Sequence, residues 1–273
     1  MSQRIVFIHG AWVTPRCWDQ MRGWFEGRGY ECLAPAWPGK DRSVEEIRAD
    51  PSALKGLGIG EIVAHYEGIV RALDEPPILI GHSFGGLFTQ ILLDRGLGAA
   101  GVAIDPAPPS GVFSFELSAY RSLLGVILTP FGWRKVVRWS YGNFRYAFVH
   151  TLTEADAHAA YDTQVTPETG RIFFQDALAG LSRHSPARVG FANKARPPLL
   201  IIAGAEDRIV PASLIRRTVR KYARAGVPAD YREFPNRTHW LIAQDGWQEI
   251  AQAAADFIEA PAKRDQTPAH GSQ

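Results

Sequence analysis

The segment 81–86 has the residue pattern of a serine nucleophile. Its sequence is GHSFGG, in which Gly81 and Gly85 flank Ser83 at two residues on either side. A buried apolar run precedes it and a helical pattern follows it, which places the serine at a strand-to-helix turn. A turn that lifts a serine hydroxyl above a sheet is strained and requires small neighbours. We therefore expect Ser83 to be a nucleophile.

Two further residues have the types that activate a serine. His239 follows the last predicted strand, and Asp207 follows the apolar run Leu199–Ala203. A serine hydroxyl needs a base to remove its proton, and the base needs an acid to orient it. The chain order Ser, Asp, His is one of the known orders of such triads. Asp105, which also ends a predicted strand, is the alternative acid.

Backbone N–H groups near Ser83 are the expected donors to a developing oxyanion. The loop His9–Trp12 follows the first predicted strand, and Phe84 follows the nucleophile. We therefore assign the N–H groups of Ala11 and Phe84 to an oxyanion hole. The aromatic residues beside the catalytic candidates, Trp12, Phe84 and Trp240, are predicted pocket walls.

The remaining histidines and the cysteines predict no metal site. His9 and His82 lie beside the catalytic candidates, and we interpret them as buried, hydrogen-bonded scaffold residues. The other histidines are scattered, and Cys17 and Cys32 lack the spacing of metal ligands. We expect no metal, no cofactor and reduced thiols, although the sequence leaves a disulfide between the two cysteines open.

The elements that must position these residues alternate between strands and helices. The predicted strands are Ile5–Ile8, Glu31–Ala34, Ile78–Ile80, Ala100–Ile104, Leu199–Ala203 and Tyr231–Phe234. The predicted helices are Pro15–Gly27, Glu61–Leu73, Phe84–Asp94, Ala212–Ala223 and Gln248–Ile258. This alternation predicts an α/β fold with a mostly parallel sheet flanked by helices. The candidate residues all follow strands, at the sheet edge where ligands bind in such folds.

One stretch interrupts the alternation. Residues 111–189 are rich in aromatic side chains and show helical patterns but no strand, and Thr153 with Asp156 predicts a helix cap. We interpret this stretch as a helical cap inserted into a core formed by residues 1–110 and 190–260. Residues 261–273 are rich in Pro, Ala, Gly and charged residues, which predicts a disordered tail.

The overall composition is typical of a soluble globular protein. Of the 273 residues 46% are hydrophobic and 21% are charged, and the formal net charge is +2. This charge argues against a nucleic-acid partner, and the basic residues within 216–224 are interpreted as a solvated helix face. No apolar run reaches the roughly 18 residues of a membrane span, and no signal-peptide pattern precedes the first strand. We expect a cytoplasmic protein, while the oligomeric state stays open.

The sequence resembles the α/β-hydrolase superfamily, in its capped, single-domain, esterase-like branch. The motifs HGAW, GHSFGG, GAEDRIVP and THW carry this resemblance, which covers Arg4 to Ile258. It implies an acyl-enzyme mechanism, and with the aromatic cap it suggests a small to medium, largely apolar ester or lactone as substrate. The family usually has two antiparallel strands before the one that precedes HGAW, and this chain starts too late for them. The expected sheet therefore has about six strands.

The resemblance leaves other functions open. The same triad supports carbon–carbon hydrolysis, thioester hydrolysis and perhydrolysis. Some members of the superfamily are ligand receptors with slow turnover, which fast multiple turnover would exclude. Serine at position 83 argues against a dehalogenase or an epoxide hydrolase, whose family members have aspartate there.

Overall fold

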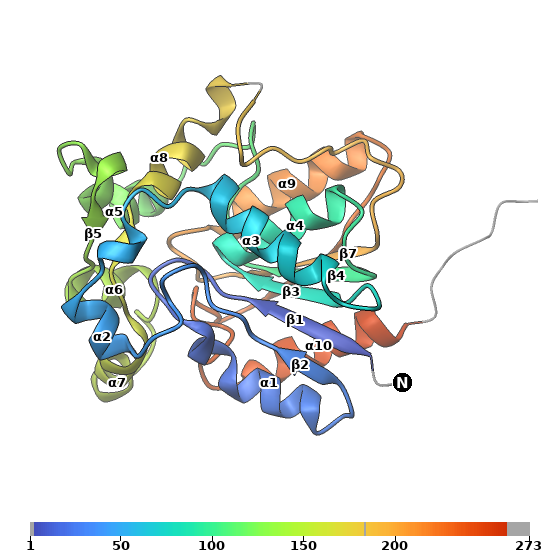
Figure 1. Ribbon diagram of the computed structural model, residues 1–273, viewed down its shortest axis with the longest axis horizontal. Helices are drawn as coiled ribbons and strands as arrows, with labels where there is room; N and C mark the ends of the chain where they lie inside the picture. The colour runs from blue at the N-terminus through green and yellow to red at the C-terminus, as the bar shows by residue number, and fades with distance from the viewer. Residues whose placement is uncertain (1–2, 183, 261–273) are drawn as a thin grey trace, which may run out of the picture.

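The core of the protein is a six-stranded parallel sheet (Figure 1). The computed structural model describes residues 3–182 and 184–260. Each strand runs parallel to its neighbours, in the order β2-β1-β3-β4-β7-β8. The strands are β1 (Arg4–Ile8), β2 (Glu31–Leu33), β3 (Ile78–His82), β4 (Ala100–Ile104), β7 (Leu199–Gly204) and β8 (Asp230–Phe234). The predicted α/β fold and the sheet of about six strands are confirmed.

Burial explains why the central strands are continuous apolar runs. Every residue of β3 and β7 is buried, and in β1 and β4 only the first residue is not. A parallel sheet with helices on both faces keeps water away from both sides of its central strands. The edge strand β8, with the sequence DYREF, is partly exposed. Apart from Arg4, the first residue of β1, the charged residues of the sheet lie in the edge strands β2 and β8, where they discourage pairing with another sheet.

Helices cover both faces of this sheet (Figure 1). The helices α1 and α10 lie on one face, and α3, α4 and α9 lie on the other. Their bounds are α1 (Asp19–Glu26), α3 (Ile59–Arg71), α4 (Phe84–Asp94), α9 (Ala212–Arg224) and α10 (Trp247–Glu259), with a 3-10 helix η1 (Pro15–Trp18) before α1. Because α4 is apolar on all sides, it is buried from Phe84 to Leu93. Its first turn, which follows Ser83, is therefore held inside the molecule.

Pattern-based prediction missed a short helix after β2. The helix α2 (Val44–Ala49) is capped by the preceding residue, Ser43. The Ser43 side chain accepts the Glu46 N–H, and the Glu46 side chain accepts the Ser43 N–H. This reciprocal pair is a capping box, and its S-x-x-E spacing is visible in the sequence. A helix of six residues is too short for apolar periodicity to reveal it. A 3-10 helix, η2 (Ser52–Leu54), follows it.

Residues 111–189, called the cap below, lie beyond the carboxyl ends of the strands (Figure 1). Their elements are α5 (Leu117–Ile127), η3 (Gly132–Arg134), β5 (Val136–Val137), α6 (Tyr141–Ala147), α7 (Glu154–Gln164), β6 (Glu168–Thr169), α8 (Arg171–Ala177) and η4 (Ala179–Leu181). The Thr153 side chain accepts the Asp156 N–H, so the predicted helix cap is confirmed. The expectation of a purely helical cap is wrong, because β5 and β6 pair antiparallel. Strands of two residues are too short to leave an alternating pattern.

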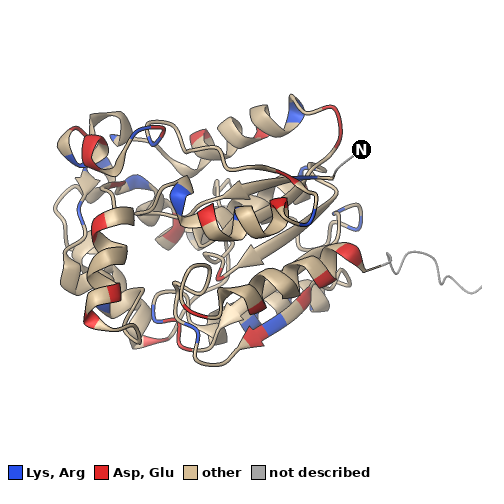
Figure 2. Ribbon diagram, turned by 90° about the horizontal axis from the view of Figure 1, so that it is seen from below, with Lys and Arg blue, Asp and Glu red and all other residues tan. Residues whose placement is uncertain are grey.

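Charges of both signs are interspersed over the helices (Figure 2). Exposed charges often pair, as Arg71 and Arg95 do with Glu67. Within residues 3–182 and 184–260, no helix is both long and apolar enough to cross a membrane. The predicted disordered tail, residues 261–273, lies outside the described residues.

The two cysteines do not form a disulfide. Cys17 and Cys32 are both free, the first buried and the second in the edge strand β2. Burial raises the pKa of the Cys17 thiol well above its usual range and that of Cys32 to about 12. Both thiols are therefore protonated at neutral pH, the form that is unreactive as a nucleophile.

Candidate active site

Ser83 occupies a strained turn between β3 and α4. Its φ and ψ angles are 57° and −122°, a combination that residues other than glycine rarely adopt. The Ser83 N–H donates to the Ile104 carbonyl at 3.0 Å, and the Ala107 N–H donates to the Ser83 carbonyl at 3.0 Å. These two bonds fix the turn against the end of β4.

Three glycines allow the backbone to pass close to Ser83. A Cβ atom on Gly81 would collide with the carbonyl of Gly85, and one on Gly85 would collide with the carbonyl of Ile8. A Cβ atom on Gly10 would lie 2.7 Å from the Cβ of Ser83. Since no side chain fits at these contacts, the glycine spacing around the serine is a packing requirement.

Asp207 and His239 are brought together by two loops that run side by side. The loop after β7 donates the Ala205 N–H to the Phe234 carbonyl and the Glu206 N–H to the Arg237 carbonyl, both at 2.9 Å. The second of these carbonyls belongs to the loop after β8, which carries His239. The two backbone bonds therefore align the candidate acid with the candidate base.

The Asp207 carboxylate makes three hydrogen bonds that fix its orientation. Oδ2 lies 2.5 Å from His239 Nδ1, and both side chains are fully buried. Oδ1 accepts the N–H groups of Ile209 at 2.8 Å and Val210 at 2.9 Å. A proton on Nδ1 in this bond leaves the Nε2 lone pair of His239 available as an acceptor, the tautomer that a general base requires.

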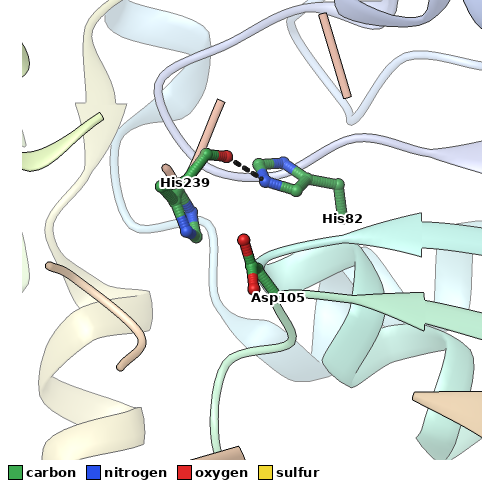
Figure 3. Close-up of side chains that lie close together, drawn as sticks. All are labelled: His82, Asp105 and His239. Carbon is green, nitrogen blue, oxygen red and sulfur yellow. Dashed lines mark hydrogen bonds between the residues drawn. The ribbon is translucent and has the colours of Figure 1, made fainter. Parts of the chain in front are cut away.

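His82 and Phe148 hold His239 from its other sides. His82 Nε2 donates to the His239 backbone carbonyl at 2.8 Å, and the two rings are 4.6 Å apart (Figure 3). Phe148 of the cap packs edge-on against the imidazole at 4.5 Å. Burial, and then the neighbouring His239, hold the pKa of His82 well below its usual range, so His82 stays neutral. These contacts fit the interpretation of His82 as a scaffold residue.

The candidate base and nucleophile are not hydrogen-bonded to each other. His239 Nε2 is buried and has no hydrogen-bond partner in the described part of the chain, so no such bond links it to Ser83 Oγ. Catalytic hydrogen bonds are often long without substrate and tighten in the complex. The structure thus joins Asp207 to His239, and shows no hydrogen bond between His239 and Ser83.

Asp105 lies in the same buried region and holds the backbone. Its Oδ1 accepts the Gly204 N–H at 2.8 Å, while Oδ2 is buried without a partner in the described residues. Burial, and then the charge of Asp207, raise the pKa of Asp105 well above its usual range. Asp105, His82 and His239 offer polar atoms within 4.8 Å of one another (Figure 3), and that they bind no metal stays a prediction. Asp207 makes the bond to His239, and Asp105 secures the start of the loop that carries Asp207.

The two predicted oxyanion donors differ from their neighbours in hydrogen bonding. The N–H groups of Ala11 and Phe84 have no partner among the hydrogen bonds of residues 3–182 and 184–260. The adjacent groups are in use, because the Trp12 N–H donates to Glu168 at 3.1 Å and the Ser83 N–H donates to a backbone carbonyl. Phe84 is the first residue of α4, where the helix dipole favours negative charge.

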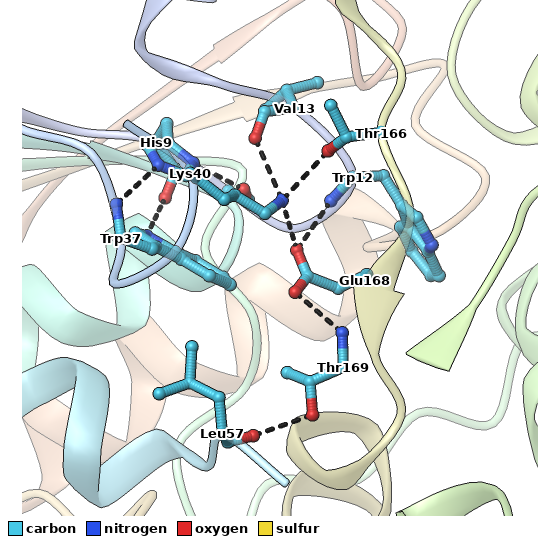
Figure 4. Close-up of polar contacts among 10 residues, drawn as sticks. His9, Trp12, Val13, Trp37, Lys40, Leu57, Thr166, Glu168 and Thr169 are labelled. Carbon is cyan, nitrogen blue, oxygen red and sulfur yellow. Dashed lines mark hydrogen bonds and ion pairs between the residues drawn. The ribbon is translucent and has the colours of Figure 1, made fainter. Parts of the chain in front are cut away.

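A buried ion pair fastens the loop of Ala11 and Trp12 to the cap (Figure 4). Lys40 Nζ lies 2.6 Å from Glu168 Oε2, and neither side chain is exposed. Nζ also donates to the Val13 carbonyl at 3.1 Å and to Thr166 Oγ1 at 3.2 Å. Burial lowers the pKa of Lys40, and the charge of Glu168 opposes that effect. Sequence reasoning missed this pair because its residues are 128 positions apart and no motif links them.

His9 holds the same loop from the core side (Figure 4). Its Nδ1 lies 2.8 Å from the Gly10 carbonyl, and its Nε2 accepts the Trp37 N–H at 3.1 Å. Burial, and then the charge of Lys40, hold the pKa of His9 well below its usual range. His9 is therefore neutral, with both ring nitrogens committed to the backbone.

Ser83 borders an apolar cavity of about 180 Å³ between the core and the cap. Trp12, Phe84 and Phe173 line it, and Trp12 stacks on Phe173 with ring centroids 4.3 Å apart. Trp240, the other predicted wall, does not line this cavity. Its indole packs against Phe148 and a second cap phenylalanine, because the turn after His239 directs it into the apolar interior of the cap.

A larger groove lies at the opposite edge of the sheet. It has a volume of about 1020 Å³ and borders the amino-terminal ends of the strands. Its charged residues Arg4 and Glu31 pair with each other at 2.7 Å. No member of the candidate triad lines it, whereas Ser83 lines the smaller cavity.

A family model identifies the class of protein that this fold and site define. The model of the alpha/beta hydrolase family matches residues 5–253. The chain therefore belongs to the alpha/beta hydrolase family, as its motifs indicated. No curated protein matches the sequence significantly.

Solved structures with a similar fold cover nearly the whole chain. Polyneuridine aldehyde esterase is 15% identical with a TM-score of 0.65, and the match covers 95% of this chain and 100% of that one. Monoacylglycerol lipase from Paleococcus ferrophilus is 19% identical with a TM-score of 0.63, covering 93% of each chain. A pyrethroid hydrolase from Sphingobium faniae JZ-2 is 18% identical with a TM-score of 0.65, covering 96% of this chain and 99% of that one. At these identities the likeness concerns the fold alone.

Proposed function

We propose that this protein is a serine hydrolase that cleaves small, largely apolar carboxylic esters or lactones through an acyl-enzyme. The observation that carries the proposal is the buried bond of 2.5 Å between His239 and Asp207, beside a serine on a strained turn. The similar structures include an esterase, a lipase and a pyrethroid hydrolase, which supports ester chemistry for this chain.

In the first half of the reaction, Ser83 Oγ attacks the ester carbonyl carbon. Its proton moves to His239 Nε2, and Asp207 stabilises the imidazolium that forms. The N–H groups of Ala11 and Phe84 bind the oxyanion of the tetrahedral intermediate. His239 then gives its proton to the leaving alkoxide, which departs as the alcohol.

In the second half, water hydrolyses the acyl-enzyme. His239 removes a proton from the water, the same two N–H groups bind the second oxyanion, and Ser83 regains its proton as the acid leaves. The neutral state of the neighbouring His82 suits this cycle, because a second positive charge beside the imidazolium would oppose its formation.

The cavity limits the size of the group that it holds. Its volume of about 180 Å³ slightly exceeds that of a cavity of about 150 Å³ that accommodates benzene. Phe113, Leu123 and Val210 contribute to an apolar lining. The substrate group in this cavity therefore has about six carbon atoms.

The proposal is tested with a fluorophosphonate, peptide mapping and a chain-length series of p-nitrophenyl esters. We expect one adduct, on Ser83, and turnover that peaks at an acyl length that fills the cavity. The Ser83→Ala variant, with unchanged circular dichroism, should show neither. An adduct without turnover would favour a receptor or a substrate that is not an ester. No adduct, or full activity in pure Ser83→Ala protein, would overturn the proposal.

A further inference from the structure

The cavity beside Ser83 is lined by one carboxyl group, that of Asp176, with one buried oxygen that lacks a partner among the described residues. Asp176 lies in the last turn of α8 and lines the cavity together with Ser83. Its Oδ1 is inaccessible to solvent and has no hydrogen-bond partner among the described residues. No ion pair with Asp176 occurs in residues 3–182 and 184–260. Among the described residues that line the cavity, Asp176 is the single charged one.

The other polar side chains of the cap in this cavity already have partners. The Tyr120 hydroxyl donates to the Ser114 carbonyl at 2.8 Å, and Ser114 Oγ accepts the Glu116 N–H at 3.2 Å. Asp176 differs from them: the residue is partly exposed, yet its Oδ1 is removed from solvent and gains no hydrogen bond from the described residues in return. Burial alone raises its pKa to about 7.

The cap elsewhere pairs its buried carboxylate completely. Glu168, eight positions before Asp176, binds Lys40 and two backbone N–H groups. The described part of the cap therefore contains one carboxylate whose two oxygens are both hydrogen-bonded, and one carboxyl group whose buried oxygen is not. A destabilising group placed against a ligand cavity is typical of a site whose partner is the ligand.

We propose that Asp176 is a specificity residue that accepts a hydrogen bond from a hydroxyl or ammonium group on an otherwise apolar ester substrate. This inference rests on the proposed ester hydrolysis and narrows its substrate class to hydroxy- or amino-substituted esters. Phe173, Val210 and Leu214 bind the hydrocarbon part, and the donor group compensates the carboxyl. Asp176 takes no part in bond cleavage, so its effect lies mainly in KM.

The test compares esters that differ at one terminal group. One series consists of p-nitrophenyl esters of ω-hydroxy and ω-amino acids, each paired with the ester that has a methyl group in that place. A second series consists of ω-hydroxyalkyl and ω-aminoalkyl acetates with matching alkyl acetates, which places the donor on the alcohol. In at least one series, kcat/KM should favour the donor-bearing ester by about tenfold to a hundredfold, the effect of a hydrogen bond to a charged group.

Two variants of Asp176 separate recognition from structure. Asp176→Leu should abolish the preference for the donor, and the loss should appear as a change in KM for the donor-bearing esters. Asp176→Asn keeps an acceptor oxygen without charge, so it should retain the preference for hydroxyl and lose the preference for ammonium. The matched control is Asp162→Leu, which removes an exposed carboxylate from α7 and should change neither preference.

The outcomes distinguish this inference from the proposed function. Turnover of the methyl esters without any donor preference would overturn the role of Asp176 and leave ester hydrolysis standing. A preference that survives Asp176→Leu, or that Asp162→Leu also removes, would overturn it as well. Loss of all turnover together with loss of the Ser83 adduct would mean that the proposed function itself is wrong.

Discussion

The two walls of the cavity are built on different principles. The core wall is formed by the loops that carry Ser83 and Asp207, and the loop of His239 supports the second of these through backbone hydrogen bonds. Close glycine contacts fix the turn of Ser83. The cap wall consists mainly of the apolar side chains of α5 and α8, together with the unpaired Asp176. Several side chains on or beside α5 are also exposed on the outer face, such as Leu117, which is 84% exposed.

This difference shows which part of the site requires exact atom positions and which part does not. Proton transfer and oxyanion binding require atoms placed to within a fraction of an ångström, which rigid strand ends supply. Recognition of an apolar group requires only a cavity of the right volume with a few polar groups. We therefore expect changes in the core wall to affect kcat and changes in the cap wall to affect stability and KM.

The largest expected effect is the difference in kcat between variants of the two buried aspartates, Asp207 and Asp105. Asp207→Asn should lower kcat by about 10⁴-fold, because the amide favours the wrong histidine tautomer. Asp105→Asn keeps the acceptor for the Gly204 N–H and should change kcat by less than about tenfold. Steady-state kinetics on one p-nitrophenyl ester checks both values. A larger loss in Asp105→Asn would reassign the acid.

The next largest effect, on stability, is expected from the ion pair between Lys40 and Glu168, which joins the cap to the loop of Trp12. Glu168→Ala should lower the free energy of unfolding by about 3–5 kcal/mol, because it leaves Lys40 buried without a counter-charge. The double variant Lys40→Met, Glu168→Leu should recover much of this loss. Urea unfolding measures both, with Glu61→Ala as the control, since its exposed pair with Arg171 contributes less than about 1 kcal/mol. Equal losses in the single and double variants would contradict an electrostatic origin.

A smaller effect, on the pH dependence of stability, is expected from the Asp176 carboxyl in the cap wall. The pKa of Asp176 is raised to about 7 in the folded protein, whereas an unfolded aspartate titrates near 4. Between these values the folded state holds a proton that the unfolded state has lost, so stability falls as the pH rises from about 4 to 7. Asp176→Asn should therefore increase the free energy of unfolding by about 1–3 kcal/mol at pH 8 and change it little at pH 4. If the free energy of unfolding varied with pH in the same way in Asp176→Asn and in the native protein, this expectation would be wrong, and the Asp176 carboxyl would be hydrated or paired.

The smallest effect is expected on the outer face of the cap. Leu117→Gln and Leu128→Gln replace side chains that are 84% and 69% exposed, so each should change the free energy of unfolding by less than about 0.5 kcal/mol. Thermal unfolding of each variant checks this value. A loss above about 1 kcal/mol would mean that these leucines are buried against a partner in solution.

The parts of this structure that follow local rules were predictable from the sequence. The buried strands appear as β-branched runs, and the glycines around Ser83 follow from the contacts of a strained turn. The assignment of Asp207 to the histidine rested on its place after β7, and the observed bond agrees with that placement. The helix α2 also had a local signal, the spacing of Ser43 and Glu46, which a search for apolar periodicity does not detect.

Features that depend on distant partners had no such signal. Lys40 and Glu168 look like solvated charges in the sequence, and only the fold brings them together. Asp176 lies in the seven-residue helix α8, which is too short for residue spacing to show which side chains face inward. The position of Asp176 in the cavity lining therefore cannot be inferred from the sequence. Trp240 adjoins His239 in the sequence, yet the turn between them directs the two side chains into different environments.

The ion pair between Lys40 and Glu168 also restricts how the cap is able to move. Two fully buried charges cannot separate without each losing its counter-charge, so the pair opposes any movement of residues 166–169 away from Lys40. A displacement of the whole cap would have to break this pair, so the cost of two unpaired buried charges opposes it.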